Sequence, residues 1–337
     1  MSAKPKTAIS KEQGRRLTHL LGLDFATSGI KAVRLKKTKD LIALAAADIL
    51  PPCSPDAEER PALPKPLATY YAALCATMDD AALRVFTQIL PSEDEDIDAL
   101  VRTSLNAAAD CRVGGLVLSL AKGKRESTLL GISVPEKTIR RYLELFANGA
   151  PAPHSLELSG LAALSAFLYN RGSQTENQTV CVIETGARHT YASFLHRNQL
   201  QIINRFDVGG DLLVRQVEIA LGVDADMAGT ILSGGSVDVS SQVRQVLLPF
   251  TRQLAIYREF VERQNKSTLS AVYISGGLAT SSYWQTAVKE VLGFIPQVWS
   301  PFEKIEIQPG AFPENLKGQE SRFAAAVGAA LAGMEAL

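Results

Sequence analysis

Surplus charge and long apolar runs are both absent from this sequence of 337 residues. Its 35 Lys and Arg residues are balanced by 35 Asp and Glu residues, so it lacks the clustered basic excess that nucleic-acid binding requires. No stretch reaches the ~20 apolar residues of a membrane span, and the N-terminal segment MSAKPKTAISKEQGRRLTHLL contains no apolar secretory core. These absences argue against a nucleic-acid binder and predict a cytoplasmic protein.

Cysteine and histidine are also scarce. The cysteines, Cys53, Cys75, Cys111 and Cys181, are scattered without a CxxC pair, so we predict free thiols that fill small apolar spaces in a reducing compartment. The four histidines do not have metal-ligand spacing. One of them, His189, lies in a turn beside candidate ligand-binding residues, where we expect an exposed side chain.

What the sequence does contain is a duplicated pattern of three short strands followed by a helix, and its length suggests about two domains. Apolar side chains at helical spacing predict the first helix over 67–78. A Gly-Gly-Asp sequence opens the second helix, which Asp211 is expected to cap. The strands are expected at 20–25, 30–37 and 41–51 in the first unit and at 180–184, 190–196 and 199–206 in the second.

Between the two units the composition changes twice. A proline-rich stretch at 51–66 is typical of a loop, and residues 84–148 predict a small inserted α/β subdomain. Its expected elements are a helix that begins in the acidic run 92–98, strands at 114–122 and 127–135, and a helix at 136–147. We therefore divide the chain into a first lobe (1–83 and 149–178), the insertion (84–148), a second lobe (179–320, with a helical part at about 211–262) and a C-terminal helix (321–337) that returns to the first lobe.

Candidate ligand-binding residues follow the first strand of each unit. Carboxylates end these strands, at Asp24 and Glu184, and small or hydroxyl residues come next. Two such turns could grip the phosphates of a nucleotide through N–H groups and hydroxyls, while the acids orient a hydrated Mg²⁺. Ordinary strand-end turns have the same composition, which is the alternative explanation of either turn alone. The candidates are Asp24, Ala26, Thr27, Ser28 and Lys31 in the first turn, Glu184, Gly186 and Thr190 in the second, and Gly209, Gly210, Ser275, Gly276 and Gly277 beyond them.

The order of these motifs resembles that of the actin, heat-shock ATPase and sugar-kinase superfamily. More narrowly, the chain resembles the PilM family, the FtsA-like cytoplasmic proteins of type IV pilus assembly. The resemblance implies an α/β fold of duplicated actin-like (ribonuclease H-like) lobes, in which the 84–148 insertion matches the small subdomain of PilM and FtsA proteins. The matching stretches cover nearly the whole chain and are LLGLDFATSGIKAVRL, RFDVGGDLLVRQVEIALGV, AVYISGGLA, VLGFIPQVWSPFEKIEI and AAAVGAALAGM.

The resemblance also implies a function. Two lobes would close over ATP and Mg²⁺, held by the candidate residues above. The implied partner is the short N-terminal cytoplasmic segment of a PilN-like inner-membrane protein, which in the family lies in a groove between the first lobe and the insertion. The protein would then be peripheral to the inner membrane and reach it only through that partner. Self-association is allowed by analogy of fold alone.

Four departures from the family pattern surround the predicted nucleotide site. Ala26 stands where the family has glycine, Glu184 replaces aspartate, further glycines are missing after Gly277, and Leu248-Pro249 stand where acidic residues are usual. Ala26 would be strained if its backbone needed a positive φ. We expect ATP hydrolysis to be weak or absent, at most that of a slow ATPase. Lys31 either contacts a phosphate or is a solvated strand lysine, and the sequence favours neither.

Three alternatives share the fold and differ in function. A nucleotide-free pseudo-ATPase adaptor of the same complex would keep the partner and lose ATP. A small-molecule kinase of the superfamily needs a general base near the γ-phosphate, and no Asp or His is convincingly placed for that role. The cytoplasmic part of a type II secretion GspL-like protein would be expected to continue into a membrane span, which the sequence lacks.

Overall fold

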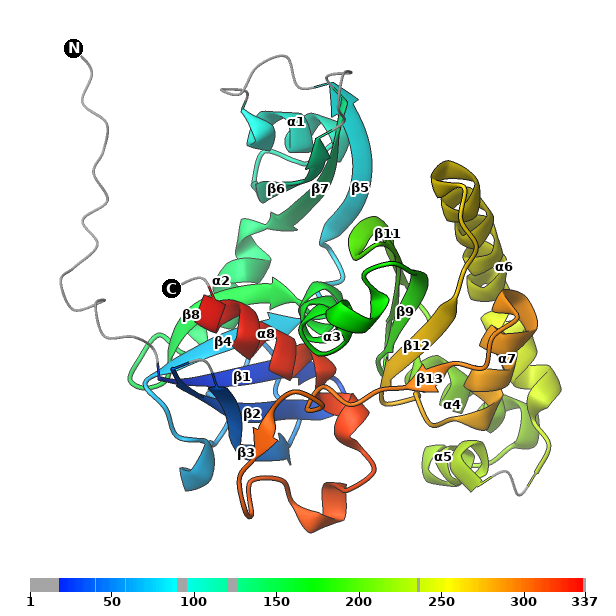
Figure 1. Ribbon diagram of the computed structural model, residues 1–337. Helices are drawn as coiled ribbons and strands as arrows, with labels where there is room; N and C mark the ends of the chain where they lie inside the picture. Colours follow the sequence, from blue (N-terminus) through cyan, green and yellow to red (C-terminus); the bar gives the residue numbers. More distant parts are fainter. Residues whose placement is uncertain are drawn as a thin grey trace.

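The computed structural model describes residues 18–39, 41–57, 59–89, 96–120, 126–234 and 237–335. Two lobes, each built on one sheet, lie on either side of helices α3 (Ser159–Thr175) and α8 (Ala324–Glu335), and a small third sheet projects from the first lobe (Figure 1). Within the described residues, no helix is both long enough and apolar enough to cross a membrane. All four cysteines have free thiols, as predicted.

The first lobe contains a six-stranded sheet. Its strands are β1 (His19–Ala26), β2 (Gly29–Thr38), β3 (Leu41–Leu50), β4 (Tyr71–Ala76), β8 (Ala152–Leu158) and β14 (Glu306–Ile307), in the order β14-β3-β2-β1-β4-β8. The first three form an antiparallel meander, and β4 lies parallel to both β1 and β8. Consecutive residues of β1 are buried because both faces of the sheet are covered: Leu20 packs in the core around α3 and α8, and Leu21 packs in a core on the opposite face.

The second lobe repeats this arrangement. Its strands are β9 (Thr179–Thr185), β10 (Thr190–His196), β11 (Gln199–Phe206), β12 (Ala271–Gly276) and β13 (Gln297–Val298), in the order β11-β10-β9-β12-β13. The order β11-β10-β9-β12 corresponds to β3-β2-β1-β4 of the first lobe, so the duplicated strand pattern is confirmed. One face is covered by helices α4 (Gly210–Leu221), α5 (Ala225–Gly234), α6 (Ser240–Asn265) and α7 (Ser282–Leu292).

The helix expected over 67–78 is wrong. A 3-10 turn at Lys65–Leu67 and strand β4 occupy most of these residues. All side chains from Ala72 to Ala76 are buried, because β4 lies between β1 and β8 with both faces covered. A short continuous apolar run fits a central strand as well as a helix, and here the pairing with β1 decides.

The insertion is a three-stranded antiparallel sheet with two helices. Its elements are β5 (Ala82–Ile89), α1 (Ile97–Ser104), β6 (Cys111–Leu120), β7 (Glu126–Pro135) and α2 (Glu136–Glu144), and its strand order is β5-β7-β6. The two predicted strands and two predicted helices are confirmed, and β5 is an additional strand. Asp96 caps α1 by accepting the N–H of Ala99 at 3.1 Å, whereas residues 92–95 of the acidic run lie outside the described residues.

Helix α8 packs closely on β1 and α3, because alanine and glycine form its contact face. A Cβ on Gly328 would lie 1.7 Å from the carbonyl oxygen of Ala162 on α3, and a Cβ on Gly22 of β1 would lie 2.0 Å from the carbonyl oxygen of Ala326. The core around these two helices contains side chains from the sheets of both lobes. The predicted alanine-rich C-terminal helix is therefore confirmed, and it belongs to the contact that joins the lobes.

Candidate functional site

A row of ionisable side chains crosses the first sheet at the predicted site. Asp24 on β1 is in register with Lys31 on β2 and with Cys75 on β4, and Cys75 is in register with Glu157 on β8. Ser159, the first residue of α3, donates from its hydroxyl to Oδ1 of Asp24 at 2.8 Å. The structure thus brings together two residues that the sequence singled out and adds three that it did not.

Burial controls the protonation of the carboxyl groups here. It raises the pKa of Asp24, and the positive charge of Lys31 opposes that rise. Glu184, near the end of β9 in the second lobe, has its pKa raised to about 8 by burial and by the neighbouring charge of Asp24. Burial also raises the pKa of Glu157 to about 7. At neutral pH the Glu184 carboxyl group is therefore mostly protonated.

These groups fit a hydrated cation and a polar ligand between the lobes. The charge of Asp24 raises the pKa of Glu184. The ammonium of Lys31 donates to Ser28 Oγ at 2.9 Å and to a backbone carbonyl at 3.1 Å. The hydroxyl of Ser275 is fully buried and has no hydrogen-bond partner among the described residues. No cluster of three metal-ligating side chains occurs in that part of the chain, so a cation here would keep much of its water shell, as Mg²⁺ commonly does.

The first turn is a tight hairpin between β1 and β2. Ala26 pairs with Gly29 across it and does not have a positive φ, so the strain considered for Ala26 does not arise. The glycine requirement lies at Gly29, whose φ is 116° and whose added Cβ would lie 2.8 Å from a carbonyl oxygen of β3. Thr27 and Ser28 are exposed at the tip. Lys31 is buried, at 6% exposure, so the alternative of a solvated strand lysine is wrong.

The second turn and the start of α4 use their backbone donors on each other. The N–H of Gly210 donates to the carbonyl oxygen of Gly186 at 3.2 Å, and the N–H of Asp211 donates to that of Ala187 at 2.8 Å. A Cβ on Gly209 would lie 2.4 Å from the Ala187 oxygen. The close approach that these glycines permit is therefore between two segments of the protein, and two N–H groups of the helix start are already paired.

Two polar side chains of this region have specific partners. Gly209 is the N-cap of α4, so the expectation that Asp211 caps the helix is wrong. Asp211 instead accepts a long hydrogen bond, 3.4 Å, from the hydroxyl of Thr27 in the other lobe. The hydroxyl of Thr190 donates to the carbonyl oxygen of Val208 at 2.7 Å. Thr27 and Asp211 thus connect the first predicted turn directly to the start of α4.

The Ser275-Gly276-Gly277 segment seats the end of β12 against the end of β9. Gly276 has a φ of 93°, and a Cβ there would lie 2.1 Å from the carbonyl oxygen of Thr185. The N–H of Gly277 donates to the same oxygen at 2.8 Å, and the Thr185 hydroxyl donates to the carbonyl oxygen of Ser275 at 2.9 Å. Gly277 has open space where a side chain would be. Sequence reasoning missed Thr185, although it directly follows Glu184.

His189 is not an exposed turn residue, which corrects the expectation from sequence. Its ring is buried, with Nε2 2.8 Å from Oδ1 of Asp79 and Nδ1 3.1 Å from Oδ1 of Asp207. Arg188 forms an ion pair with Asp79 at 3.0 Å, and Arg205 donates to the backbone oxygen of Asp79 at 2.8 Å. Three basic side chains of the second lobe therefore hold the turn between β4 and β5, where the chain enters the insertion.

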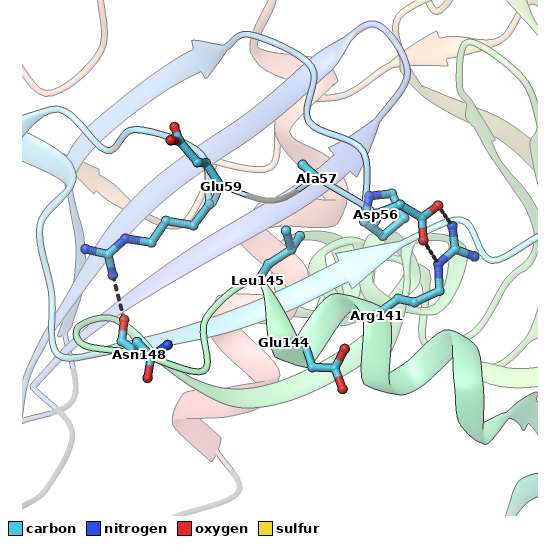
Figure 2. A pocket seen from close by; sticks show the side chains of 9 residues that line it. Asp56, Ala57, Glu59, Arg141, Glu144, Leu145 and Asn148 are labelled. Carbon is cyan, nitrogen blue, oxygen red and sulfur yellow. Dashed lines mark hydrogen bonds and ion pairs between the residues drawn. The ribbon is translucent and has the colours of Figure 1, made fainter.

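A second candidate site lies between the 51–66 loop of the first lobe and α2 of the insertion. It is a pocket of ≈ 780 Å³, and Figure 2 shows Ala57 and Leu145 between the Asp56–Arg141 pair on one side and Asn148 on the other. Arg141 pairs with both carboxylate oxygens of Asp56. The pocket is lined by Pro55, Asp56, Ala57, Glu59, Arg60, Arg141, Glu144, Leu145 and Asn148.

A second arginine bridge closes the other side of this pocket. Arg60 donates to the carbonyl oxygens of Asn148, at 3.2 Å, and Ala150, at 2.8 Å. No motif in the sequence pointed to these residues, because the pocket forms only where two segments about 85 positions apart come together. The resemblance to a family predicts a groove between the first lobe and the insertion, and no other feature of the sequence does.

Duplicated lobes, an acidic side chain near the end of the first strand of each, and an inserted subdomain define a protein of the actin-like ATPase fold. Comparison with solved structures agrees. A chain of the "PilM-PilN type IV pilus biogenesis complex" superposes with a TM-score of 0.78 over 95% of this chain and 99% of that chain, at 18% sequence identity.

Two further structures are more distant. One is a Bacteroides thetaiotaomicron protein described as having an actin-like ATPase fold and unknown function, with a TM-score of 0.46, 10% identity and coverage of 90% of this chain and 95% of that one. The other is the activator of the 2-hydroxyisocaproyl-CoA dehydratase from Clostridium difficile with bound ADPNP, with a TM-score of 0.46, 12% identity and coverage of 94% and 95%. Similarity at this level says nothing about the ligand of this chain. No curated protein matches the sequence significantly.

A family model supplies the narrower assignment. Residues 161–334, just over half of the chain, match the model of the type IV pilus assembly protein PilM. This chain belongs to the PilM family. The family resemblance and the actin-like fold predicted from the sequence are both confirmed.

Proposed function

We propose that this protein is a cytoplasmic scaffold of a type IV pilus, or of a related envelope complex, recruited by the N-terminal cytoplasmic segment of a PilN-like inner-membrane protein. The observation that carries the proposal is the pocket between the 51–66 loop and α2 in a member of the PilM family. Its ≈ 780 Å³ is within the range of ligand sites. Peripheral attachment to the inner membrane follows from this partner.

Pre-organisation of the pocket supports this role. The Asp56–Arg141 pair holds the loop against α2, and Arg60 holds it against residues 148–150, before any ligand arrives. A pocket whose walls are already ordered loses less conformational entropy when a peptide binds. The site therefore suits a short segment that becomes ordered only on binding.

Binding of the partner segment is the test of the scaffold role. The full chain should bind a synthetic peptide of that segment, and Ala57→Arg should weaken the binding at least tenfold because the long side chain enters the pocket. Ala255→Arg on the exposed side of α6 is the matched control and should bind normally. Unchanged affinity in Ala57→Arg would remove this pocket from the proposal.

ATP with Mg²⁺ is the second part of the proposal, and it would set the angle between the lobes rather than drive rapid chemistry. Asp24 and Glu184 would hold Mg²⁺ through water, while Thr27, Ser28 and Lys31 would contact the phosphates. Glycines 186, 209, 210, 276 and 277, with Ala26, Thr190 and Ser275, would form the rest of the walls. When bound, Mg²⁺ supplies the positive charge that two neighbouring carboxyl groups require.

Weak or absent hydrolysis is supported by two observations. A mostly protonated Glu184 is a poor metal-orienting group, and the N–H groups of Gly210 and Asp211 are already hydrogen-bonded within the protein. The same paired N–H groups favour the second candidate function, an adaptor of the same complex that binds no nucleotide.

Calorimetric titration of the full chain with ATP, with and without Mg²⁺, distinguishes the two candidates. We expect micromolar binding in the presence of Mg²⁺ and its loss in Asp24→Ala, which removes the buried carboxylate of the first lobe. Asp110→Ala, an exposed carboxylate on the insertion, should bind as the wild type does. Absence of binding to folded wild-type protein would support the nucleotide-free adaptor.

A further inference from the structure

Two of the charged side chains that line the pocket have no partner within the described residues. Arg141 is neutralised by Asp56, and Arg60 is directed at backbone carbonyl oxygens. The side chains of Glu59 and Glu144 are exposed at the pocket and form no hydrogen bond or ion pair within the described residues. The three carboxylates of the lining outnumber its two guanidinium groups, so the pocket has a net charge of −1, and its carboxylates without a partner are those of Glu59 and Glu144.

The surface between these carboxylates is apolar. Pro55 and Ala57 of the loop and Leu145 of the opposite wall line the pocket, and Leu145 is 8% exposed. Lysine and arginine side chains combine a long apolar stem with a cationic end, so they can bury the stem on apolar surface and keep the charge at its edge. An acidic side chain would be repelled by Glu59 and Glu144, and a neutral one would gain no ion pair with them.

We infer that this pocket recognises basic side chains of the partner segment, with Glu59 on the loop and Glu144 on α2 as separate acceptors (Figure 2). The inference rests on the proposed function, which places a cytoplasmic segment of an inner-membrane protein here. Cytoplasmic segments close to a membrane span are enriched in lysine and arginine. The partner segment therefore carries the charge that complements the pocket. Glu59 and Glu144 determine which side chains the pocket prefers, whereas its apolar surface contributes to binding of any segment.

Three labelled peptides test this inference on the full chain. They are acetylated, amidated nonapeptides of the repeat Ala-Lys-Leu, and the same peptides with glutamine or glutamate in place of lysine. Fluorescence anisotropy should show about tenfold tighter binding of the lysine peptide than of the glutamine peptide at low salt. This preference should shrink as salt rises, because exposed charge pairs are screened. The glutamate peptide should bind most weakly.

Variants of the acceptors connect this preference to the pocket. The double variant Glu59→Gln and Glu144→Gln should bind the lysine and glutamine peptides equally. Glu218→Gln on α4, in the second lobe, is the matched control and should keep the preference. Glu59 and Glu144 are both exposed, so the double substitution leaves the core intact. Equal binding of both peptides by the wild type, no binding of any peptide, or a preference that survives in the double variant would overturn the inference.

The inference and the proposed function fail in different ways. If the double variant still binds the partner segment with wild-type affinity while Ala57→Arg does not, the pocket is the docking site and charge recognition is wrong. If the wild type fails to bind the partner segment but prefers the lysine peptide, the pocket recognises a cation and the proposed partner is wrong.

Discussion

At the scale of single residues, the half-buried carboxyl groups of Glu184 and Glu157 give the protein a specific dependence on pH. The pKa of Glu184 is raised from 4.5 to about 8 and that of Glu157 to about 7, in both cases mainly by burial. Between pH 4.5 and these values the folded protein binds protons that the unfolded chain has released. The free energy of unfolding therefore decreases as pH rises through this window. The stabilising contribution of the two protonated groups is fully present only below pH 4.5.

The variant Glu184→Gln should remove part of this dependence, because its amide cannot ionise. We expect the wild type to lose stability from about pH 5 to pH 8, and Glu184→Gln to be more stable than the wild type at pH 8 by about 1–2 kcal/mol. Urea unfolding at several pH values measures both quantities. Identical pH profiles of the two proteins would show that Glu184 ionises normally in the folded state.

At the scale of elements, helix α8 depends on small residues for its position between the lobes. Gly328 touches the backbone of α3 so closely that no side chain fits without movement of one helix, since a Cβ would lie 1.7 Å from the Ala162 oxygen. Gly229 on α5 has no atom within 4 Å of its added Cβ. The two glycines are both helical and differ only in what surrounds them.

This pair predicts opposite effects of the same substitution. Gly328→Ala should destabilise the protein by about 2–4 kcal/mol, because overpacking forces the helices apart. Gly229→Ala should be neutral or stabilise by up to about 1 kcal/mol, because alanine is the better helix former. Thermal and urea unfolding of both variants measure these changes. A Gly328→Ala protein as stable as the wild type would contradict the close packing of α3 and α8.

At the scale of the whole molecule, the Asp79–Asp80 turn connects three parts. Asp79 contacts Arg188 and His189 of the second lobe, and Asp80 accepts a hydrogen bond from the hydroxyl of Thr138 on α2 at 2.5 Å. The helix α2 is also a wall of the pocket. This short turn therefore links the insertion to the second lobe.

Removal of the Asp79 carboxylate should loosen this connection. In Asp79→Ala, His189 stays buried with one partner fewer, so we expect a loss of about 1–3 kcal/mol and faster amide hydrogen exchange in both β5 and α2. Exchange mass spectrometry measures the effect region by region. Asp110→Ala is the control on the insertion itself. Faster exchange confined to the 77–80 turn would mean that this turn does not hold the insertion in place.

Much of the site chemistry could not be read from the sequence. The carboxylates and turn residues were found because strand ends with acids, hydroxyls and glycines are local patterns. Neighbouring strands determine that Lys31 is buried, that the pKa of Glu184 is raised and that Glu157 lies in the same row of ionisable side chains as Asp24. His189 was assigned to solvent because its partner Asp79 lies 110 positions away.

The sequence by itself determined the first three strands of each lobe, their hairpins and the family, because apolar runs and turn residues act over a few neighbouring positions. Only the tertiary structure decided that 71–76 is a strand, since a buried apolar run takes its form from the elements beside it. The pocket was decided in the same way, since its walls come from Asp56 and Arg141, 85 positions apart. Contacts between distant segments are fixed by packing, which no local pattern contains.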